Sequence, residues 1–169
     1  MQRPSRFVAV DSAVLLALTA GDPEGEGAVD CLISAGFHFL VPETVLHELA
    51  EVVQHEKDKV AVSHAKQALI NLVNYAFIPS YLSPVEMGIA KIAAERLVRE
   101  GCLSSAPLGD ALVLTEAALN KCQLLLTRSE SLLAARCDSL TLALVDADLF
   151  AVAPISPAEI VGFFGDSQH

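Results

Sequence analysis

The sequence has few basic residues, no long apolar run and no paired cysteines. Eleven Lys and Arg residues stand against 21 Asp and Glu residues, which gives the 169-residue chain a formal net charge of −10 at pH 7. A protein that binds nucleic acid over its whole surface needs many basic side chains to contact phosphates, so this balance argues against that class. It leaves room for a small basic rim or for bound cations, and it favours a basic partner.

The missing apolar runs and cysteine pairs bear on the compartment. No stretch reaches the roughly 18 apolar residues that a membrane span requires, so we expect no membrane partner. The opening "MQRPSRFVAVD" has no hydrophobic segment before a cleavage site, and we expect no secretion signal. We expect reduced core thiols in a cytoplasmic protein, because the four cysteines are far apart: Cys31, Cys102, Cys122 and Cys137.

Apolar residues make up 53% of the chain, enough for a large core in one domain. Apolar runs that read as buried strands alternate with segments of helical periodicity. We predict strands at 6–10, 37–42, 75–80, 123–128 and 140–146, and helices at 12–21, 27–35, 43–56, 58–74, 84–100, 110–122, 129–137 and 156–165, with a loop at 21–27. The pattern indicates a single α/β domain over residues 1–169: a three-layer α/β/α sandwich with a central, mainly parallel sheet.

Three acids fall where sites gather in such a sheet, beyond the carboxyl ends of strands. Asp11 directly follows the first strand, Glu48 lies in the first turns of the helix after the second, and Asp110 opens the helix before the fourth. Ser129 follows that fourth strand. Asp11 and Asp110 are equally readable as helix caps, although Ser12 also offers a capping hydroxyl. Their joint placement at one edge of the sheet is the informative observation.

Glu48 sits in "HELAE", which is one residue away from a zinc-protease signature. That signature needs a second histidine where Glu51 stands, so we set the protease reading aside. On a helical projection Glu48 lies about 40° beyond Val52, closer to the apolar stripe than His47. We expect its carboxylate to follow the edge of the core into a cleft. A solvated helix glutamate is the alternative.

Clustered carboxylates favour hard divalent cations. Mg²⁺ or Mn²⁺ takes oxygen ligands, usually a few carboxylates with waters and a substrate phosphate. Without a cation the acids repel one another and their pKa values rise. With one, the site neutralises a phosphodiester oxygen and activates a water, which explains how an acidic protein acts on an anionic polymer.

Four segments in order resemble the landmarks of a PIN domain: "FVAVDSAVLLAL", "VPETVLHELAEVV", "GDALVLTEAALNKCQLLLTRSESLL" and "APISPAEIVGFF". Many PIN domains are Mg²⁺- or Mn²⁺-dependent ribonucleases, including the toxins of bacterial toxin–antitoxin pairs. The resemblance implies that Asp11, Glu48 and Asp110 ligate the metal and that Ser129 assists through its hydroxyl. It departs at the fourth landmark, where the family usually has an aspartate, often with another two residues later. This chain has Ser129 and Ser131, and Glu130 is out of phase.

Two functional hypotheses follow. The first is a metal-dependent endoribonuclease, a toxin that pairs with an antitoxin protein and forms a homodimer through the apolar helices near 43–75 and 83–100. The second is a PIN-fold RNA- or protein-binding regulatory module that has lost nuclease activity, which the two serines favour. An unrelated α/β fold with three coincidental acids is the remaining alternative. Arg128, beside Ser129, is the basic residue best placed to meet a phosphate.

Overall fold

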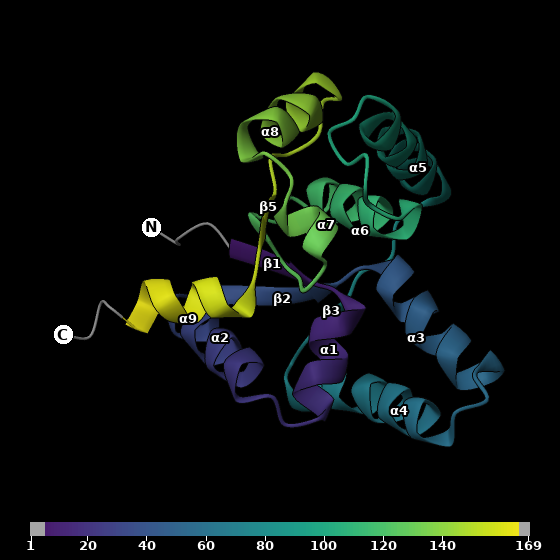
Figure 1. Ribbon diagram of the computed structural model, residues 1–169, viewed down its shortest axis with the longest axis vertical. Helices are drawn as coiled ribbons and strands as arrows, with labels where there is room; N and C mark the ends of the chain where they lie inside the picture. Colours follow the sequence, from purple (N-terminus) through teal and green to yellow (C-terminus); the bar gives the residue numbers. More distant parts are fainter. Residues whose placement is uncertain (1–5, 166–169) are drawn as a thin grey trace.

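A computed structural model describes residues 6–165 of the chain. Five parallel strands form one sheet in the order β3-β2-β1-β4-β5 (Figure 1). The strands are β1 Arg6–Val10, β2 Phe37–Val41, β3 Ile78–Pro79, β4 Leu124–Leu126 and β5 Ala153–Ile155. The central strand is β1, whose last three residues are buried because helices cover both faces. The predicted α/β class and parallel sheet are confirmed.

Helices cover the sheet on both sides. They are α1 Ser12–Thr19, α2 Pro23–Ser34, α3 Glu43–His55, α4 Lys59–Asn74, α5 Pro84–Arg99, α6 Leu108–Leu119, α7 Glu130–Leu133, α8 Cys137–Asp146 and α9 Pro157–Gly165. Figure 1 shows α5 to α8 on one side and α1, α2, α4 and α9 on the other. Helix α3 reaches the edge at which α6 begins and contacts that helix. Buried apolar side chains from both layers form the core around β1. No helix within residues 6–165 is long and apolar enough to cross a membrane.

Strand register brings the ends of β1 and β4 together. Val10 pairs with Leu126, and Asp11 N donates a hydrogen bond to Leu126 O at 3.1 Å. The residues that follow these strands, Asp11 and Thr127, therefore emerge side by side at the carboxyl edge of the sheet. This edge is where the sequence places the candidate acids.

The strand predicted at 140–146 is wrong, because this segment belongs to α8. Leu140 and Leu144 are buried four residues apart, whereas Leu142 and Val145 are exposed. A spacing of four residues between buried side chains is typical of a helix. The sequence suggested a strand because Leu142, although exposed, makes the apolar run nearly continuous. The fifth strand is β5, which lies further along the chain.

The loop predicted at 21–27 is also wrong, since α2 begins at Pro23. Asp22 caps it by accepting a hydrogen bond from Gly25 N at 2.7 Å. A Cβ on Gly25 would lie 2.9 Å from Asp22 Oδ2 and 3.2 Å from Leu18 Cδ2. This glycine therefore serves close packing inside a helix, although it reads as a loop residue in the sequence.

Helix ends match the prediction in part. The sequence predicts α5 to start with Ser83 as N-cap and Pro84 as its first residue, and to end before Gly101. Ser83 does cap α5, and it forms a capping box with Glu86. The cap of α1 is Asp11 where the sequence favoured Ser12. Asp110 is not a cap, because α6 begins two residues earlier, after Pro107, and Asp110 lies in its first turn.

Candidate metal-binding site

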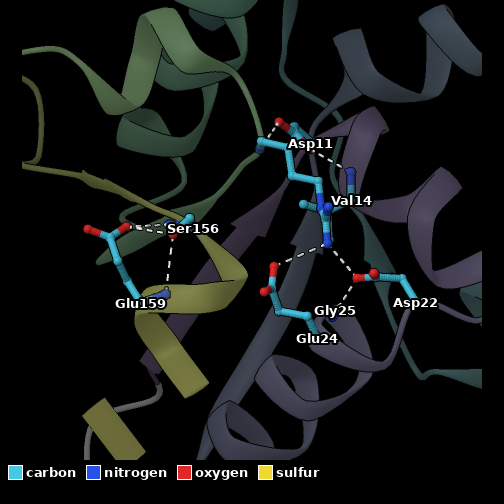
Figure 2. Close-up of polar contacts among 8 residues, drawn as sticks. Asp11, Val14, Asp22, Glu24, Gly25, Ser156 and Glu159 are labelled. Atoms are coloured by element: carbon cyan, nitrogen blue, oxygen red, sulfur yellow. Dashed lines mark hydrogen bonds and ion pairs between the residues drawn. The ribbon is translucent and has the colours of Figure 1, made fainter. Parts of the chain in front are cut away.

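Asp11 is held by donors from two neighbouring strand ends. It is 9% exposed. Its Oδ1 accepts a hydrogen bond from Val14 N at 2.9 Å, which caps α1 (Figure 2). Its Oδ2 accepts hydrogen bonds from the Thr127 hydroxyl and from Arg128 N, the latter at 3.1 Å. The capping alternative is therefore correct for Asp11, and the same carboxylate stands at the sheet edge.

Glu48 reaches the same edge from α3. Its Oε2 accepts a hydrogen bond from the Ser12 hydroxyl at 2.7 Å, so it is tied to the residue next to Asp11. Its Oε1 lies 3.4 Å from the position that a Cβ on Gly109 would occupy. A side chain at that position would crowd the carboxylate where α6 begins. Glu48 is half-buried, whereas His47 and Glu51 are exposed, which confirms its predicted place beside the apolar stripe.

Asp110 is linked to the segment that follows β4. Its Oδ2 accepts a hydrogen bond from the Ser129 hydroxyl at 2.5 Å, and the Ser131 hydroxyl lies 3.5 Å from the same oxygen. Ser129 N donates to the Thr127 hydroxyl at 3.0 Å, and that hydroxyl bonds Asp11. Asp11 and Asp110 are thus the two ends of one hydrogen-bonded chain through Thr127 and Ser129.

The three carboxylates share an electrostatic environment. Burial raises the pKa of Asp11, its hydrogen bonds lower that pKa, and the negative charge of Asp110 raises it. Burial also raises the pKa of Glu48, the hydrogen bond from Ser12 lowers it, and the charges of Asp110 and Asp11 raise it. The charge of Asp110 therefore disfavours ionisation of both Asp11 and Glu48, and the charge of Asp11 disfavours ionisation of Glu48. A bound cation relieves this repulsion.

The donor set fits a hard cation in type and charge. Oxygen ligands alone are present, as Mg²⁺ and Mn²⁺ prefer, and Mg²⁺ commonly takes one or two protein carboxylates and completes its shell with water. Within residues 6–165, no three Asp, Glu, His or Cys side chains stand close enough to hold one ion together. The carboxylates instead accept hydrogen bonds from Ser12, Thr127 and Ser129. The arrangement therefore fits an ion held by few direct ligands.

The "HELAE" segment forms no zinc site. The side chain of His47 is 74% exposed, and its Nε2 lies 3.5 Å from Glu43 Oε1 within the same helix. His55 similarly lies near Glu51. Each histidine therefore lies beside a glutamate four residues earlier in its own helix.

Arg128 is engaged by acids of α2. Its Nη2 pairs with Asp22 and lies 3.5 Å from Glu24 Oε1. Figure 2 shows dashed lines that join both acids to one nitrogen between them. The guanidinium that the sequence favoured for phosphate contact is thus already neutralised. Glu130 is exposed, consistent with its being out of phase.

Glu116 is a buried acid that sequence reasoning missed. It is 0% exposed within α6 and accepts hydrogen bonds from Thr44, through the hydroxyl and through the backbone N at 3.2 Å. Helix α3 has Pro42 at its N-cap position and no side-chain cap of its own, so Glu116 satisfies its first turn from another helix. An acid inside the apolar run "ALVLTEAAL" was the available signal, because a buried charge needs a partner.

Comparison with known proteins supports the fold. No family model and no curated protein matches the sequence. The chain is similar to a solved structure described as VapBC2 from Rickettsia felis bound to a DNA fragment from their promoter. The match has a TM-score of 0.60 and 12% identity, and it covers 89% of this chain and 98% of that one. At this identity the likeness establishes the fold alone, which is PIN-like.

Proposed function

We propose that this protein is a cytoplasmic, Mg²⁺- or Mn²⁺-dependent endoribonuclease whose whole chain forms one PIN-like domain. The observation that carries the proposal is the placement of Asp11, Glu48 and Asp110 at the carboxyl edge of a PIN-like sheet, where hydrogen bonds from Ser12, Thr127 and Ser129 orient them. The PIN resemblance and the shared fold support the same reading. A bound cation would offset the negative charge of these acids when the scissile phosphate approaches them.

The protein groups have distinct tasks in this proposal. Among Asp11, Glu48 and Asp110, one or two carboxylates would ligate the cation directly and the others would reach it through bound water. The cation, when bound, neutralises a phosphate oxygen and activates water. Thr127 and the backbone N of Arg128 fix the orientation of Asp11. The Ser12 hydroxyl orients the carboxylate of Glu48, and the Ser129 hydroxyl orients that of Asp110. When substrate is bound, the Ser129 hydroxyl would be able to donate to a phosphate oxygen instead of Asp110. These hydroxyls compensate partly for the missing fourth acid by orienting the three that remain.

RNA cleavage by the purified protein tests this function. We expect cleavage with Mn²⁺ or Mg²⁺ that EDTA abolishes, and a loss of at least about 100-fold in Asp11→Asn, since metal stabilisation is worth several kcal/mol. Asp58→Asn is the matched control, because Asp58 also caps a helix by accepting a backbone N–H, at the exposed start of α4. Cleavage that survives Asp11→Asn would indicate a contaminating nuclease.

A regulatory module without nuclease activity is the second candidate. Two observations favour it: Ser129 and Ser131 stand where the resemblance implies acids, and no three acids in the described chain are grouped around a metal position. Failure of the wild-type protein to cleave any RNA with either metal, together with retained RNA or protein binding, would establish this alternative.

We propose an antitoxin protein and a second copy of this chain as partners. The solved structure of similar fold is a VapBC2 assembly, and toxins of toxin–antitoxin pairs are among the PIN domains. Val85 and Ile92 on α5 are 73% and 69% exposed, which supports an apolar contact on this helix. Sizing in solution tests the dimer, and a monomer at micromolar concentration would contradict it. Toxicity on expression that a co-expressed neighbouring gene relieves would test the antitoxin.

A further inference from the structure

A second hollow lies beside the candidate metal-binding site. It has a volume of about 190 Å³, and its walls are the 101–105 loop, Ser131 with residues 134–136, and Ser139 of α8. The neighbouring hollow is lined by Asp110 of the candidate site together with Ser129 and Glu130, whereas Asp11 and Glu48 are not among its lining residues. The two hollows share Ser105, Ser131 and Ala134, so together they form one continuous trough.

Hydrogen-bond donors line this second hollow, and no Asp or Glu is among its lining residues. Hydroxyls come from Ser104, Ser105, Ser131 and Ser139, and the guanidinium comes from Arg136. Within residues 6–165, Arg136 has no carboxylate within 4 Å, in contrast to Arg128, which pairs with two acids. Other basic residues in the described part of the chain, such as Arg99 and Lys66, also lack a described carboxylate within 4 Å. What distinguishes Arg136 is its place in a serine-lined hollow that shares residues with the hollow beside Asp110.

The start of α8 adds backbone donors to the hollow, and its first turn also contains the exposed acid Asp138, which is not among the lining residues. Arg136 occupies the N-cap position without a side-chain cap, and Ser139 lies in the first turn. The free backbone N–H groups of a first turn favour an anion. The volume corresponds to roughly six waters at about 30 Å³ each, which is room for a hydrated phosphate group. No aromatic residue lines the hollow, so it offers no surface on which a base could stack.

We propose that this hollow binds a backbone phosphate of an RNA strand, next to the bond presented to the acids. The inference rests on the proposed function for the identity of the strand. A phosphodiester carries one negative charge and oxygens that only accept hydrogen bonds, which matches a guanidinium among serine hydroxyls. The strand would run along the trough past Ser131, with one phosphate at Arg136 and the scissile phosphate at Asp110.

Binding of a fluorescently labelled single-stranded oligouridylate, measured by anisotropy in EDTA over a series of salt concentrations, tests the subsite without requiring cleavage. We expect Arg136→Gln to weaken binding about tenfold, as for the loss of a charge-assisted hydrogen bond. The slope of log K against log salt should fall by about 0.7, as for one single-strand phosphate contact. Lys66→Gln removes the same charge from α4 on the opposite side of the sheet, and it should change neither quantity by as much.

A strand with one neutral methylphosphonate linkage gives a second reading. We would place the neutral linkage at each position of the oligonucleotide in turn. At one position it should weaken binding to the wild-type protein and leave the affinity of Arg136→Gln unchanged. Ser139→Ala should weaken binding a few-fold without altering the salt slope, because it removes a neutral donor. Thermal melting of each variant establishes that it is folded.

Two results would overturn the subsite directly: no RNA binding by the wild-type protein, or equal effects of Arg136→Gln and Lys66→Gln on that binding. A third would be a rise in Tm with inorganic phosphate that requires Arg136, while RNA binding does not depend on this residue. The last result would define a site for free phosphate. Arg136-dependent RNA binding without cleavage under Mn²⁺ would instead refute the nuclease and leave the subsite intact.

Discussion

The Ser129 hydroxyl donates a 2.5 Å hydrogen bond to Asp110 Oδ2, so a neutral donor stands where the PIN resemblance implies a fourth carboxylate. The hydroxyl orients Asp110, but it leaves the site with one negative charge fewer than the family pattern has. The consequence is weaker attraction for a cation, because affinity rises with the number of charged ligands.

Ser129→Asp should restore that charge without disturbing the local fold, because Ser129 caps α7 and aspartate caps equally well. We expect a lower Tm without metal, owing to repulsion from Asp110, and tighter Mn²⁺ binding by about tenfold. Ser83→Asp is the matched control, since it introduces the same charge at the exposed cap of α5. Titration with Mn²⁺ by calorimetry measures the change, and equal affinities in the two variants would contradict it.

Asp11→Asn should stabilise the metal-free protein at neutral pH. The pKa of Asp11 is raised in the folded state, chiefly by burial, so the folded protein binds the proton more tightly than the unfolded chain. The carboxylate therefore costs stability as pH rises above the unfolded value near 3.8 and through the folded pKa. We expect a Tm gain of about 2–4 °C at pH 7, as for roughly 1 kcal/mol, because asparagine retains the cap.

The gain from Asp11→Asn should shrink as the pH falls toward 3.8 and vanish below that value, where the wild-type carboxyl is protonated in both states. Thermal melts across this range measure the difference. Asp58→Asn, at the exposed cap of α4, should show no such gain. A wild-type protein that is more stable than Asp11→Asn at pH 7 without metal would show that the hydrogen bonds to Asp11 outweigh its burial.

Local signals in the sequence predicted most of the elements. Ser83, Pro84 and Gly101 correctly bounded α5, because their effects act within one helical turn. Gly101 has φ +82, the left-handed conformation that ends a helix. The prediction for 140–146 was wrong because a run of apolar residues is compatible with a strand and with a helix. Only the burial pattern in the folded protein shows that the segment is a helix.

The sequence predicted where the candidate site lies, but not the hydrogen bonds that connect its residues. Parallel strands put the residues after β1 and β4 at one edge, which the alternation of elements already implied. The bond between Thr127 and Asp11 joins residues 116 apart, and that between Ser12 and Glu48 joins residues 36 apart. Such pairings depend on strand order and side-chain rotamers, for which one sequence gives no local signal.

The cysteines should differ sharply in reactivity. All four are free: Cys122 is buried, Cys31 and Cys102 are partly buried against the core, and Cys137 is exposed, so the expectation of core thiols is wrong for Cys137. Burial raises its pKa to about 12, which leaves almost no reactive thiolate. Cys137, exposed at the start of α8, should react with iodoacetamide in the native protein at pH 8, whereas Cys122 should react only after unfolding. Mass spectrometry of labelled peptides measures both, and equal labelling rates would contradict this burial.

Glu116→Ala should destabilise the protein far more than loss of an exposed acid. It would leave the Thr44 hydroxyl and N–H without their buried acceptor and remove the link between α6 and α3. We expect a loss of about 3 kcal/mol, from unsatisfied donors and a small cavity. Glu100→Ala, which breaks an exposed ion pair with Arg96, should cost at most about 1 kcal/mol.

A double-mutant cycle identifies the cause of that loss. Glu116→Ala and Thr44→Val should be coupled by about 1–3 kcal/mol in urea unfolding, because each removes one partner of the same buried contact. Glu116→Gln keeps an acceptor and removes the cost of a buried charge, so it should lose less than Glu116→Ala. Additive effects of the two substitutions would show that Glu116 acts through packing alone. In that case Asp110 on α6 and Glu48 on α3 would owe their proximity to the apolar contacts between the helices, and not to this hydrogen bond.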